Sequence, residues 1–213
     1  MAEKKAGIIV ILSSPSGAGK TTLVRKISSR KKYKISISHT TRKPRLNEVN
    51  GKDYFFVNNK NFKKLIKDKK FLEYAKVFKN YYGSLKKTVI DKLQKGENVI
   101  FDIDWQGTKQ IKKQKLKYKI ITIFILPPSK KELFNRLLKR DQKDKKIANQ
   151  RMKQFKDDLT HWKDYDFAVI NDNVELCYKS IVKFINLKSK KKLPLKYNKN
   201  FIKKHVNYLI NAS

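Results

Sequence analysis

The sequence predicts an α/β fold, in which a parallel β-sheet is flanked by helices. Four apolar runs are typical of strands that are buried on both faces, and they cover residues 7–14, 98–104, 119–126 and 166–172. Segments with helical periodicity separate these runs, which is the order expected of a parallel sheet. The first run leads directly into a glycine-rich turn and a helix, an arrangement that binds phosphate.

The first half of the chain is predicted to alternate strands, helices and one irregular stretch. After the first strand, "TTLVRKISSR" has helical spacing, whereas residues 35–57 look extended. A short amphipathic helix is expected at 60–71, and "YYGS" is interpreted as a loop. The next helix is expected over 84–97, with Ser84 as its N-cap and Gly96 as its stop.

The second half of the chain is predicted to be helical between its two strands. The helix over 129–140 opens with a capping box, because Ser129 is followed three residues later by Glu132. A polar linker, "DQKDKK", is expected at 141–146. Further helices are expected at 147–162, at 174–187 and in the second half of a Lys-rich extension, 188–213.

Length and composition bound the class of protein. The 213 residues, 39% of them hydrophobic, suffice for one core with a small inserted lobe. The single cysteine, Cys177, excludes an internal disulfide framework and fits a reducing compartment, so we expect a cytoplasmic protein with Cys177 in its core. No apolar run approaches the roughly 20 residues that span a bilayer. The basic start and short apolar run resemble a signal peptide, but the run ends in a phosphate-loop pattern and is interpreted as a buried strand.

The net charge of +35 has two interpretations. One is a polyanionic partner such as nucleic acid. The other is compositional drift towards lysine, which we favour because the lysines are spread over every segment instead of clustering. We therefore expect no specific nucleic-acid partner and no membrane, while a homo-oligomer is compatible with the sequence. Only seven of the 53 Lys and Arg residues are Arg, and these are expected where a planar guanidinium is needed.

The strongest motif is the phosphate loop "SSPSGAGKTT" at residues 13–22. Gly17 and Gly19 allow backbone N–H groups to surround phosphate oxygens, Lys20 would reach the β- and γ-phosphates, and the Thr21 hydroxyl would bind Mg²⁺. Ser14 replaces the first glycine of the strict pattern. The alternative, a simple turn before a helix, fits the strand and helix on either side less well. The residues expected to bind the nucleotide are Ser14, Pro15, Ser16, Gly17, Ala18, Gly19, Lys20, Thr21 and Thr22.

The phosphate loop does not separate a GTPase, an ATPase, a small-molecule kinase and a helicase, so the second substrate must be inferred elsewhere. Arg42 and Arg45 are suited to clamp a phosphate dianion, and Tyr54 would add a hydroxyl donor. Glu73 is a candidate reader of guanine, because its two oxygens match the adjacent N1–H and N2–H₂ donors that adenine lacks. Ser84 could satisfy O6 of guanine.

Two acidic residues follow the second strand. Asp102 and Asp104 are two positions apart, so on a strand they would point to the same face. Carboxylates at a strand end beside a phosphate loop suit Mg²⁺ and ribose or base contacts. The alternative is that they cap the end of the strand.

Several stretches together resemble bacterial-type guanylate kinases, which are P-loop nucleoside monophosphate kinases. They are "PSGAGKTTL", "SISHTTRKPRLNEVNGKDYFFV", "FLEYAKVFKNYYGS", "NVIFDIDWQG", "FILPPS" and "DFAVIND", in the order and spacing of the family over about residues 7–187. The resemblance implies a P-loop NTPase-type sheet with an inserted mixed α/β lobe and a helical lid. It also implies transfer of the γ-phosphoryl group of ATP to GMP, with Mg²⁺, in purine nucleotide metabolism.

The resemblance also implies roles for individual residues. Asp102 would lie near the metal, and Asn171 would lie near adenine. Arg140 and Arg151 would close over the transferring phosphate, and both would act with Lys20 as catalytic residues. The residues expected to hold GMP are Ser38, Arg42, Arg45, Tyr54, Glu73, Tyr82, Gly83, Ser84 and Asp104. The implied regions are a core over 1–36, 85–126 and 155–187, a GMP-binding lobe over 37–84, a lid over 127–154 and the extension 188–213.

The lid departs from the family pattern, in which Arg-Gly precedes an acidic stretch. Here Asp141 replaces the glycine, and Lys145 and Lys146 stand where acids are common. His39 replaces a residue that is usually small, and we interpret it as a tolerated loop residue. Three alternatives stay open: a kinase of the same fold with another mononucleotide or a ribose bisphosphate as acceptor, a non-catalytic guanylate-kinase-like binding module, and a nucleic-acid-binding protein.

Overall fold

The computed structural model describes residues 6–140, 144–187 and 198–211. The chain forms two compact units. Unit 1 comprises Met1–Ile11 and Lys31–Ile120, and unit 2 comprises Leu12–Arg30 and Ile121–Ser213. These two units are defined by how densely their residues pack together. The core, GMP-binding lobe and lid that the resemblance implies are defined by function, and they stay a prediction.

The predicted parallel sheet is present among the described residues. It has the strand order β2-β7-β1-β8-β9. Four of its strands fall on the four apolar runs: β1 (Ile9–Ser13), β7 (Val99–Asp102), β8 (Ile120–Leu126) and β9 (Phe167–Ile170). The fifth, β2 (Lys34–Ile35), is short and partly exposed, so it has no apolar run to predict it. It pairs in parallel with β7, and β8 pairs in parallel with β9.

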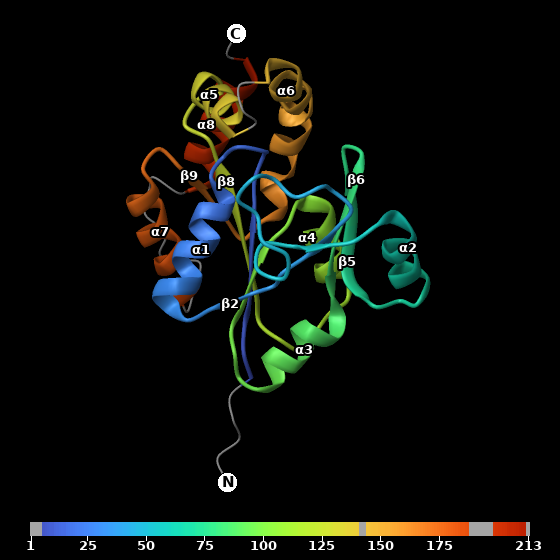
Figure 1. Cartoon of the computed structure of the whole chain (residues 1–213). Helices are drawn as coiled ribbons and strands as arrows, with labels where there is room; N and C mark the ends of the chain where they lie inside the picture. The colour runs from blue at the N-terminus through green and yellow to red at the C-terminus, as the bar shows by residue number, and fades with distance from the viewer. Residues whose placement is uncertain (1–5, 141–143, 188–197, 212–213) are drawn as a thin grey trace. The chain divides into compact units, whose positions relative to one another are not determined.

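Unit 1 also holds a second, mixed sheet. Its strand order in the described residues is β4-β3-β6-β5, with bounds β3 (His39–Thr40), β4 (Phe55–Phe56), β5 (Phe71–Val77) and β6 (Asn80–Leu85). β3 pairs in parallel with β4, and β6 pairs antiparallel with both β3 and β5. The helices of this unit are α2 (Asn59–Lys67), α3 (Lys86–Gln94) and α4 (Trp105–Lys113). Figure 1 shows β5 and β6 as a ribbon pair with α2 beside them.

Aromatic stacking fixes α2 on the second sheet. The Phe62 ring from α2 lies 4.6 Å from the Phe71 ring and 5.4 Å from the Tyr81 ring, measured between centroids. Phe62 is fully buried, and such ring pairs add about 0.5–1.5 kcal/mol to the free energy of burial. The predicted amphipathic helix is therefore confirmed, and its apolar face covers the mixed sheet.

Two local predictions in unit 1 are wrong. "YYGS" is not a loop, because it belongs to β6. Ser84 is not the N-cap of the following helix, because it pairs with Glu73 in the β5–β6 ladder. The N-cap residue of α3 is Leu85. The predicted stop is confirmed: Gly96 has φ 80° and follows the C-cap residue Lys95.

Unit 2 contains most of the predicted helices. Their bounds are α1 (Lys20–Lys31), α5 (Lys130–Arg140), α6 (Lys145–Thr160), a 3₁₀ turn (His161–Asp164), α7 (Val174–Asn186) and α8 (Lys199–Asn211). The predicted cap of α5 is confirmed, since the N–H of Glu132 donates to Ser129 Oγ at 3.1 Å. Residues 141–143 of the predicted linker lie outside the described residues. Lys145 and Lys146 do not continue that linker but begin α6, whose N-cap is Asp144.

The C-terminal extension ends in the predicted short helix, α8. Ile202, Val206 and Leu209 of α8 are buried, and α8 packs on α6 beside α5, as Figure 1 shows. The ring Nε2 of His205 lies 2.9 Å from the carbonyl oxygen of Pro127, directly after the end of β8. Helix α8 is thus part of the packed structure of unit 2. Residues 188–197 lie outside the described residues.

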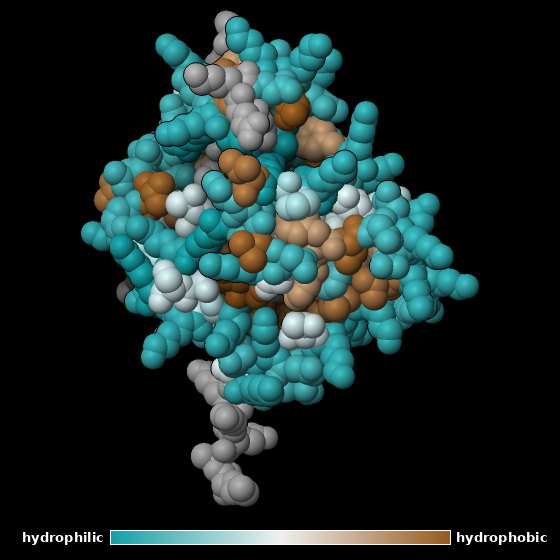
Figure 2. All heavy atoms as spheres, in the orientation of Figure 1, coloured by the Kyte–Doolittle hydropathy of each residue, from teal (hydrophilic) through white to brown (hydrophobic). Residues whose placement is uncertain are grey.

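The surface and the core agree with the composition. Hydrophilic residues cover most of the face in Figure 2, in keeping with the high lysine content of the chain. Cys177 is buried in α7, as predicted. Among the described residues, no helix combines the length and the apolar character that crossing a bilayer requires.

Candidate functional site

The phosphate loop lies in unit 2, between the end of β1 at Ser13 and the start of α1 at Lys20. Gly17 and Gly19 have φ values of 92° and 93°, in the left-handed region that glycine adopts without strain. A Cβ on Gly17 would also lie within 3.0 Å of side-chain atoms of Leu133 and Leu137 in α5. Both glycines that the sequence singled out are therefore required by backbone geometry and by close packing.

The first turn of α1 is suited to an anion. It begins with Lys20 and Thr21, and it contains no acidic residue. The free N–H groups of a helix N-terminus carry partial positive charge, which an acidic side chain nearby would otherwise offset. The phosphate loop, Lys20 and the N-terminus of α1 are therefore all suited to bind a phosphate.

The two predicted lid arginines meet at the phosphate loop. Arg140, the last residue of α5, and Arg151, in α6, each donate a hydrogen bond of 3.1 Å to Ser16 Oγ. All three residues belong to unit 2. Two guanidinium groups converge on one loop hydroxyl, so both are within reach of a phosphate bound by that loop.

Asn171 also contacts the phosphate loop. It follows β9 directly and is 1% exposed. Its side-chain Nδ2 donates to the carbonyl oxygen of Ala18 at 2.7 Å. The sequence placed Asn171 near the nucleotide, and the structure puts its amide against the loop backbone.

The predicted arginine clamp lies in unit 1 and is held by a glutamate. Nη2 of Arg42 lies 2.8 Å from both carboxylate oxygens of Glu48, and Arg45 donates to the same carboxylate from its backbone N–H at 2.8 Å and from Nη1 at 3.2 Å. The Arg42 and Glu48 side chains are only 14% and 15% exposed. Burial acts to raise the pKa of Glu48, but the hydrogen bonds from Arg45 and Arg42 outweigh it, so the pKa lies below its usual value. Glu48 is therefore a carboxylate that orients both guanidinium groups.

Two tyrosines accompany the clamp. The Arg42 guanidinium carbon lies 5.4 Å from the centre of the Tyr54 ring, a cation–π distance. The Tyr54 and Tyr82 rings meet edge to face at 6.0 Å. Burial, followed by the nearby charge of Asp102, raises the pKa of Tyr54 above its usual value. Tyr54 thus remains a neutral hydroxyl donor at physiological pH.

The predicted guanine-reading residues converge on the mixed sheet. Glu73 is 3% exposed and stands opposite Ser84 in the β5–β6 ladder. The hydroxyl oxygens of Ser84 and Ser38 are 3.3 Å apart, and both side chains are buried. A Cβ on Gly83 would come as close as 2.9 Å to the Phe71 ring, so only a glycine lets this strand pack against Phe71. The sheet therefore gathers a carboxylate and two hydroxyls in one buried place.

Gly107 makes room for Glu73. It lies in the first turn of α4, where any Cβ would overlap Oε2 of Glu73 and approach its Cδ within 3.1 Å. Gly107 is a functional candidate that was not predicted from the sequence. The only signal was its place after the acidic run in "FDIDWQG".

The two aspartates have different local roles. Asp102 is the last residue of β7, as predicted. Asp104 lies beyond the strand and is the N-cap of α4, accepting from the N–H of Gly107 at 3.0 Å and from Gln106 Nε2 at 3.0 Å. The expectation that both lie on one strand face is therefore wrong, and Asp104 caps the helix that follows instead of the end of the strand.

His39 is not a loop residue, because it lies in β3. Its ring stacks on Phe55 at 4.8 Å and meets Phe71 edge-on at 6.1 Å. Burial lowers the pKa of His39 below 6.5. The imidazole therefore packs as a neutral aromatic ring in this sheet.

Glu48 is the other functional candidate that was not predicted from the sequence. Its signal was the spacing Arg-x-x-Arg-x-x-Glu from Arg42, which places a carboxylate within reach of both arginines across a turn. Within the described ranges, no group of three or more His, Cys, Asp or Glu is arranged to hold a metal ion.

The comparisons with known proteins agree on one family. The guanylate kinase family model matches residues 7–188. The chain is 47% identical over 181 residues to a guanylate kinase of Blochmanniella floridana, covering 83% of this chain and 85% of the relative. It is 45% identical over 183 residues to a guanylate kinase of Rickettsia prowazekii, covering 85% of this chain and 92% of the relative.

A solved structure is similar along most of the chain. The crystal structure of guanylate kinase from Anaplasma phagocytophilum superposes with a TM-score of 0.68 at 30% sequence identity. The match covers 91% of this chain and 93% of that one. The likeness therefore extends over most of the α/β fold, in which a parallel sheet is flanked by helices.

Proposed function

The chain belongs to the guanylate kinase family, and we propose that its two groups of polar residues divide the work of phosphoryl transfer from ATP to GMP. The phosphate loop and lid arginines of unit 2 hold the triphosphate. The arginine clamp and the buried carboxylate of unit 1 hold the monophosphate. The reaction gives ADP and GDP.

On the donor side, the loop residues bind by backbone and charge. The N–H groups between Ser14 and Thr22 surround the phosphates, and Lys20 neutralises the β- and γ-phosphates. Arg140 and Arg151 offset the charge that spreads over the equatorial oxygens in the transition state. Their hydrogen bonds to Ser16 support this role, because they already bring both guanidinium groups to the loop.

On the acceptor side, one observation carries the proposal: Glu73 is buried beside Ser84 and Ser38, in the same unit as the arginine clamp. The two oxygens of this carboxylate match the adjacent N1–H and N2–H₂ donors of guanine, and the two hydroxyls beside it are suited to the O6 edge. Arg42, Arg45, Tyr54 and Tyr82 would hold the phosphate dianion.

The chemistry needs positioning more than covalent help. The phosphate oxygen of GMP is already anionic, so it attacks the γ-phosphorus of ATP without a general base. The P–O bond to the β-phosphate breaks, and its electron pair leaves on ADP. The chain's own residues orient the two nucleotides, neutralise charge and exclude water, which limits hydrolysis of ATP.

Mg²⁺ fits the residues that the chain offers. Magnesium in kinases is held mainly by substrate phosphates and water, with one or two protein oxygens, so a three-carboxylate cluster is not required. The Thr21 hydroxyl and the Asp102 carboxylate are oxygen donors of that kind. When bound, the ion would offset charge on the β- and γ-phosphates. We expect the enzyme in the cytoplasm, where its nucleotide substrates occur.

The Gly107→Ala substitution tests the acceptor site. The new Cβ would displace the Glu73 carboxylate, so we expect KM for GMP to rise about tenfold or more, while KM for ATP stays within about twofold. Gly107 is buried, so the Tm of the variant should be measured as well, to separate loss of GMP binding from loss of fold. Steady-state kinetics with each substrate varied in turn would measure this. An unchanged KM for GMP would count against guanine binding by Glu73.

A further inference from the structure

We propose that Asn171 is a positioning residue that fixes the direction of the phosphate-loop backbone and ties the loop to helix α5. The proposal rests on the proposed donor site and adds to it a role for the end of β9. The expected position of Asn171 near adenine stays a separate prediction.

The side chain of Asn171 is held in one orientation. Its Nδ2 donates to the carbonyl oxygen of Ala18 at 2.7 Å, in a site where Asn171 is 1% exposed. The reversed amide would bring two acceptor oxygens together at the same distance, so hydrogen bonding fixes which atom faces the loop. Among the described residues, Oδ1 of Asn171 has no hydrogen-bond partner, which leaves the Ala18 contact as the bond that orients the side chain.

The contact with Ala18 controls a neighbouring donor. In a trans peptide, the carbonyl of one residue and the N–H of the next point in opposite directions. Because Asn171 holds the Ala18 carbonyl, the N–H of Gly19 must point away from Asn171. Ala18 lies between two glycines with positive φ, whose peptides are the most free to rotate. Without Asn171, this peptide could turn its carbonyl towards the phosphates and repel them.

Gly19 is fitted to the same contact. A Cβ at this position would overlap Nδ2 of Asn171. The glycine is thus needed for its φ and also for the approach of the asparagine amide. The two residues form one packed unit, although 152 positions separate them in the chain.

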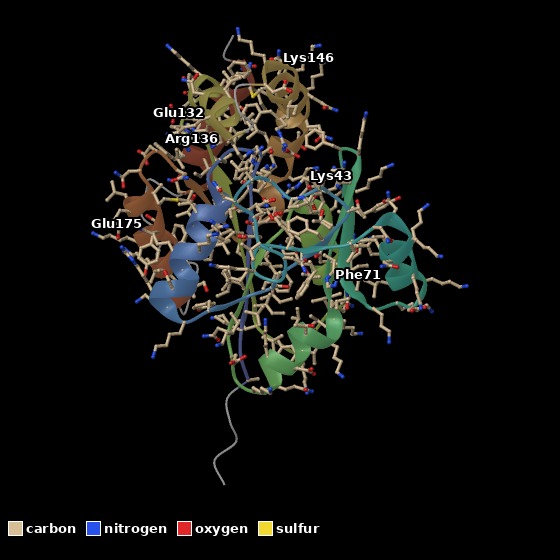
Figure 3. The ribbon with its side chains drawn as sticks, in the orientation of Figure 1. Lys43, Phe71, Glu132, Arg136, Lys146 and Glu175 are labelled. Atoms are coloured by element: carbon tan, nitrogen blue, oxygen red, sulfur yellow. The ribbon has the colours of Figure 1, made fainter. Side chains whose placement is uncertain are left out.

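The backbone of Asn171 links the loop to the lid. Its N–H donates to the carbonyl of Leu126 at 2.8 Å, and its carbonyl accepts from Nη1 of Arg136 at 3.2 Å. Arg136 also pairs with Glu132 at 2.8 Å along α5, where Figure 3 shows the two side chains as neighbours. The same helix ends at Arg140, which contacts Ser16. α5 is therefore fixed to the loop at one end by Arg140 and through Asn171 by Arg136.

The test compares Asn171→Asp with Asn171→Ala in the full chain. Aspartate places a negative oxygen against the Ala18 carbonyl, and alanine removes the donor without adding charge. We expect Kd for a non-hydrolysable ATP analogue, measured by calorimetry without GMP, to rise at least about tenfold for Asp and about fivefold for Ala. KM for GMP at saturating ATP should stay within about twofold. Asn186→Asp, the same change at an exposed position of α7, is the matched control and should leave both constants unchanged.

The outcomes separate the proposal from its alternatives. An unchanged Kd for the analogue in the alanine variant would overturn it, even if the aspartate variant fails to fold. Equal rises in Kd for the analogue and KM for GMP, with a large fall in Tm, would also overturn it, because they would show a general structural role. Since analogue binding needs no turnover, a chain that fails to phosphorylate GMP would refute the proposed acceptor and leave this test valid.

Discussion

Replacing Lys20 by Ala is expected to lower kcat by at least about a thousandfold, because comparable cationic groups in phosphoryl transfer contribute that much. Lys20 is the first residue of α1, directly after the two left-handed glycines of the loop. Its ammonium group would lie against the β- and γ-phosphates, where negative charge shifts during transfer. Steady-state release of ADP in the presence of GMP would measure the loss.

The matched control for this variant is Lys31→Ala, at the exposed C-terminal end of the same helix. It removes the same charge from a chain of net charge +35, and kcat should stay within about twofold. If Lys20→Ala kept more than a tenth of the wild-type kcat, the loop would not be the triphosphate site.

Replacing Arg42 by Lys is expected to raise KM for GMP by about tenfold to a hundredfold. A lysine keeps the charge but cannot replace the planar guanidinium, which contacts Glu48, the Lys43 carbonyl and the Tyr54 ring at the same time. The ammonium would also leave Glu48 with fewer hydrogen bonds. Initial rates measured against GMP concentration, at saturating ATP, would give the constant.

The neighbouring lysine provides the control for Arg42. Lys43→Ala removes a full charge next to the clamp, but the side chain is exposed, and KM for GMP should change less than about twofold. If Arg42→Lys were as mild as Lys43→Ala, the clamp would act only through net charge, and the proposed phosphate geometry would be wrong.

The sequence predicted the parallel sheet because its strands are buried on both faces and are therefore continuous apolar runs. It did not predict β5, because the bulge between Phe71 and Glu73 breaks the alternation and buries Leu72 and Glu73 in succession. It also missed α4, which has only nine residues and carries Gly107 in its first turn.

In the candidate site too, residues that are neighbours in the sequence could be predicted, whereas contacts between distant residues could not. The phosphate loop is contiguous in sequence, so its glycines and Lys20 could be identified directly. Glu73 and Ser84 were singled out by chemistry and by the family resemblance, but their pairing across a ladder depends on strand register. Asn171 and Ala18 are brought together only by the fold, so no local pattern could show that one holds the other.

The most direct measurement of the central claim is ADP release from ATP with a panel of acceptors: GMP, IMP, AMP, CMP, UMP and a ribose bisphosphate. We expect GMP to give the highest kcat/KM, and IMP, which lacks the 2-amino donor, to be lower by about a hundredfold, because it cannot make the hydrogen bond from that amino group to the Glu73 carboxylate. We expect this order of acceptors without added salt, because nucleic-acid binding is not expected to interfere with the assay. No stimulation by GMP, or a higher kcat/KM with any other acceptor, would contradict the assignment of Glu73 and the arginine clamp as the GMP site.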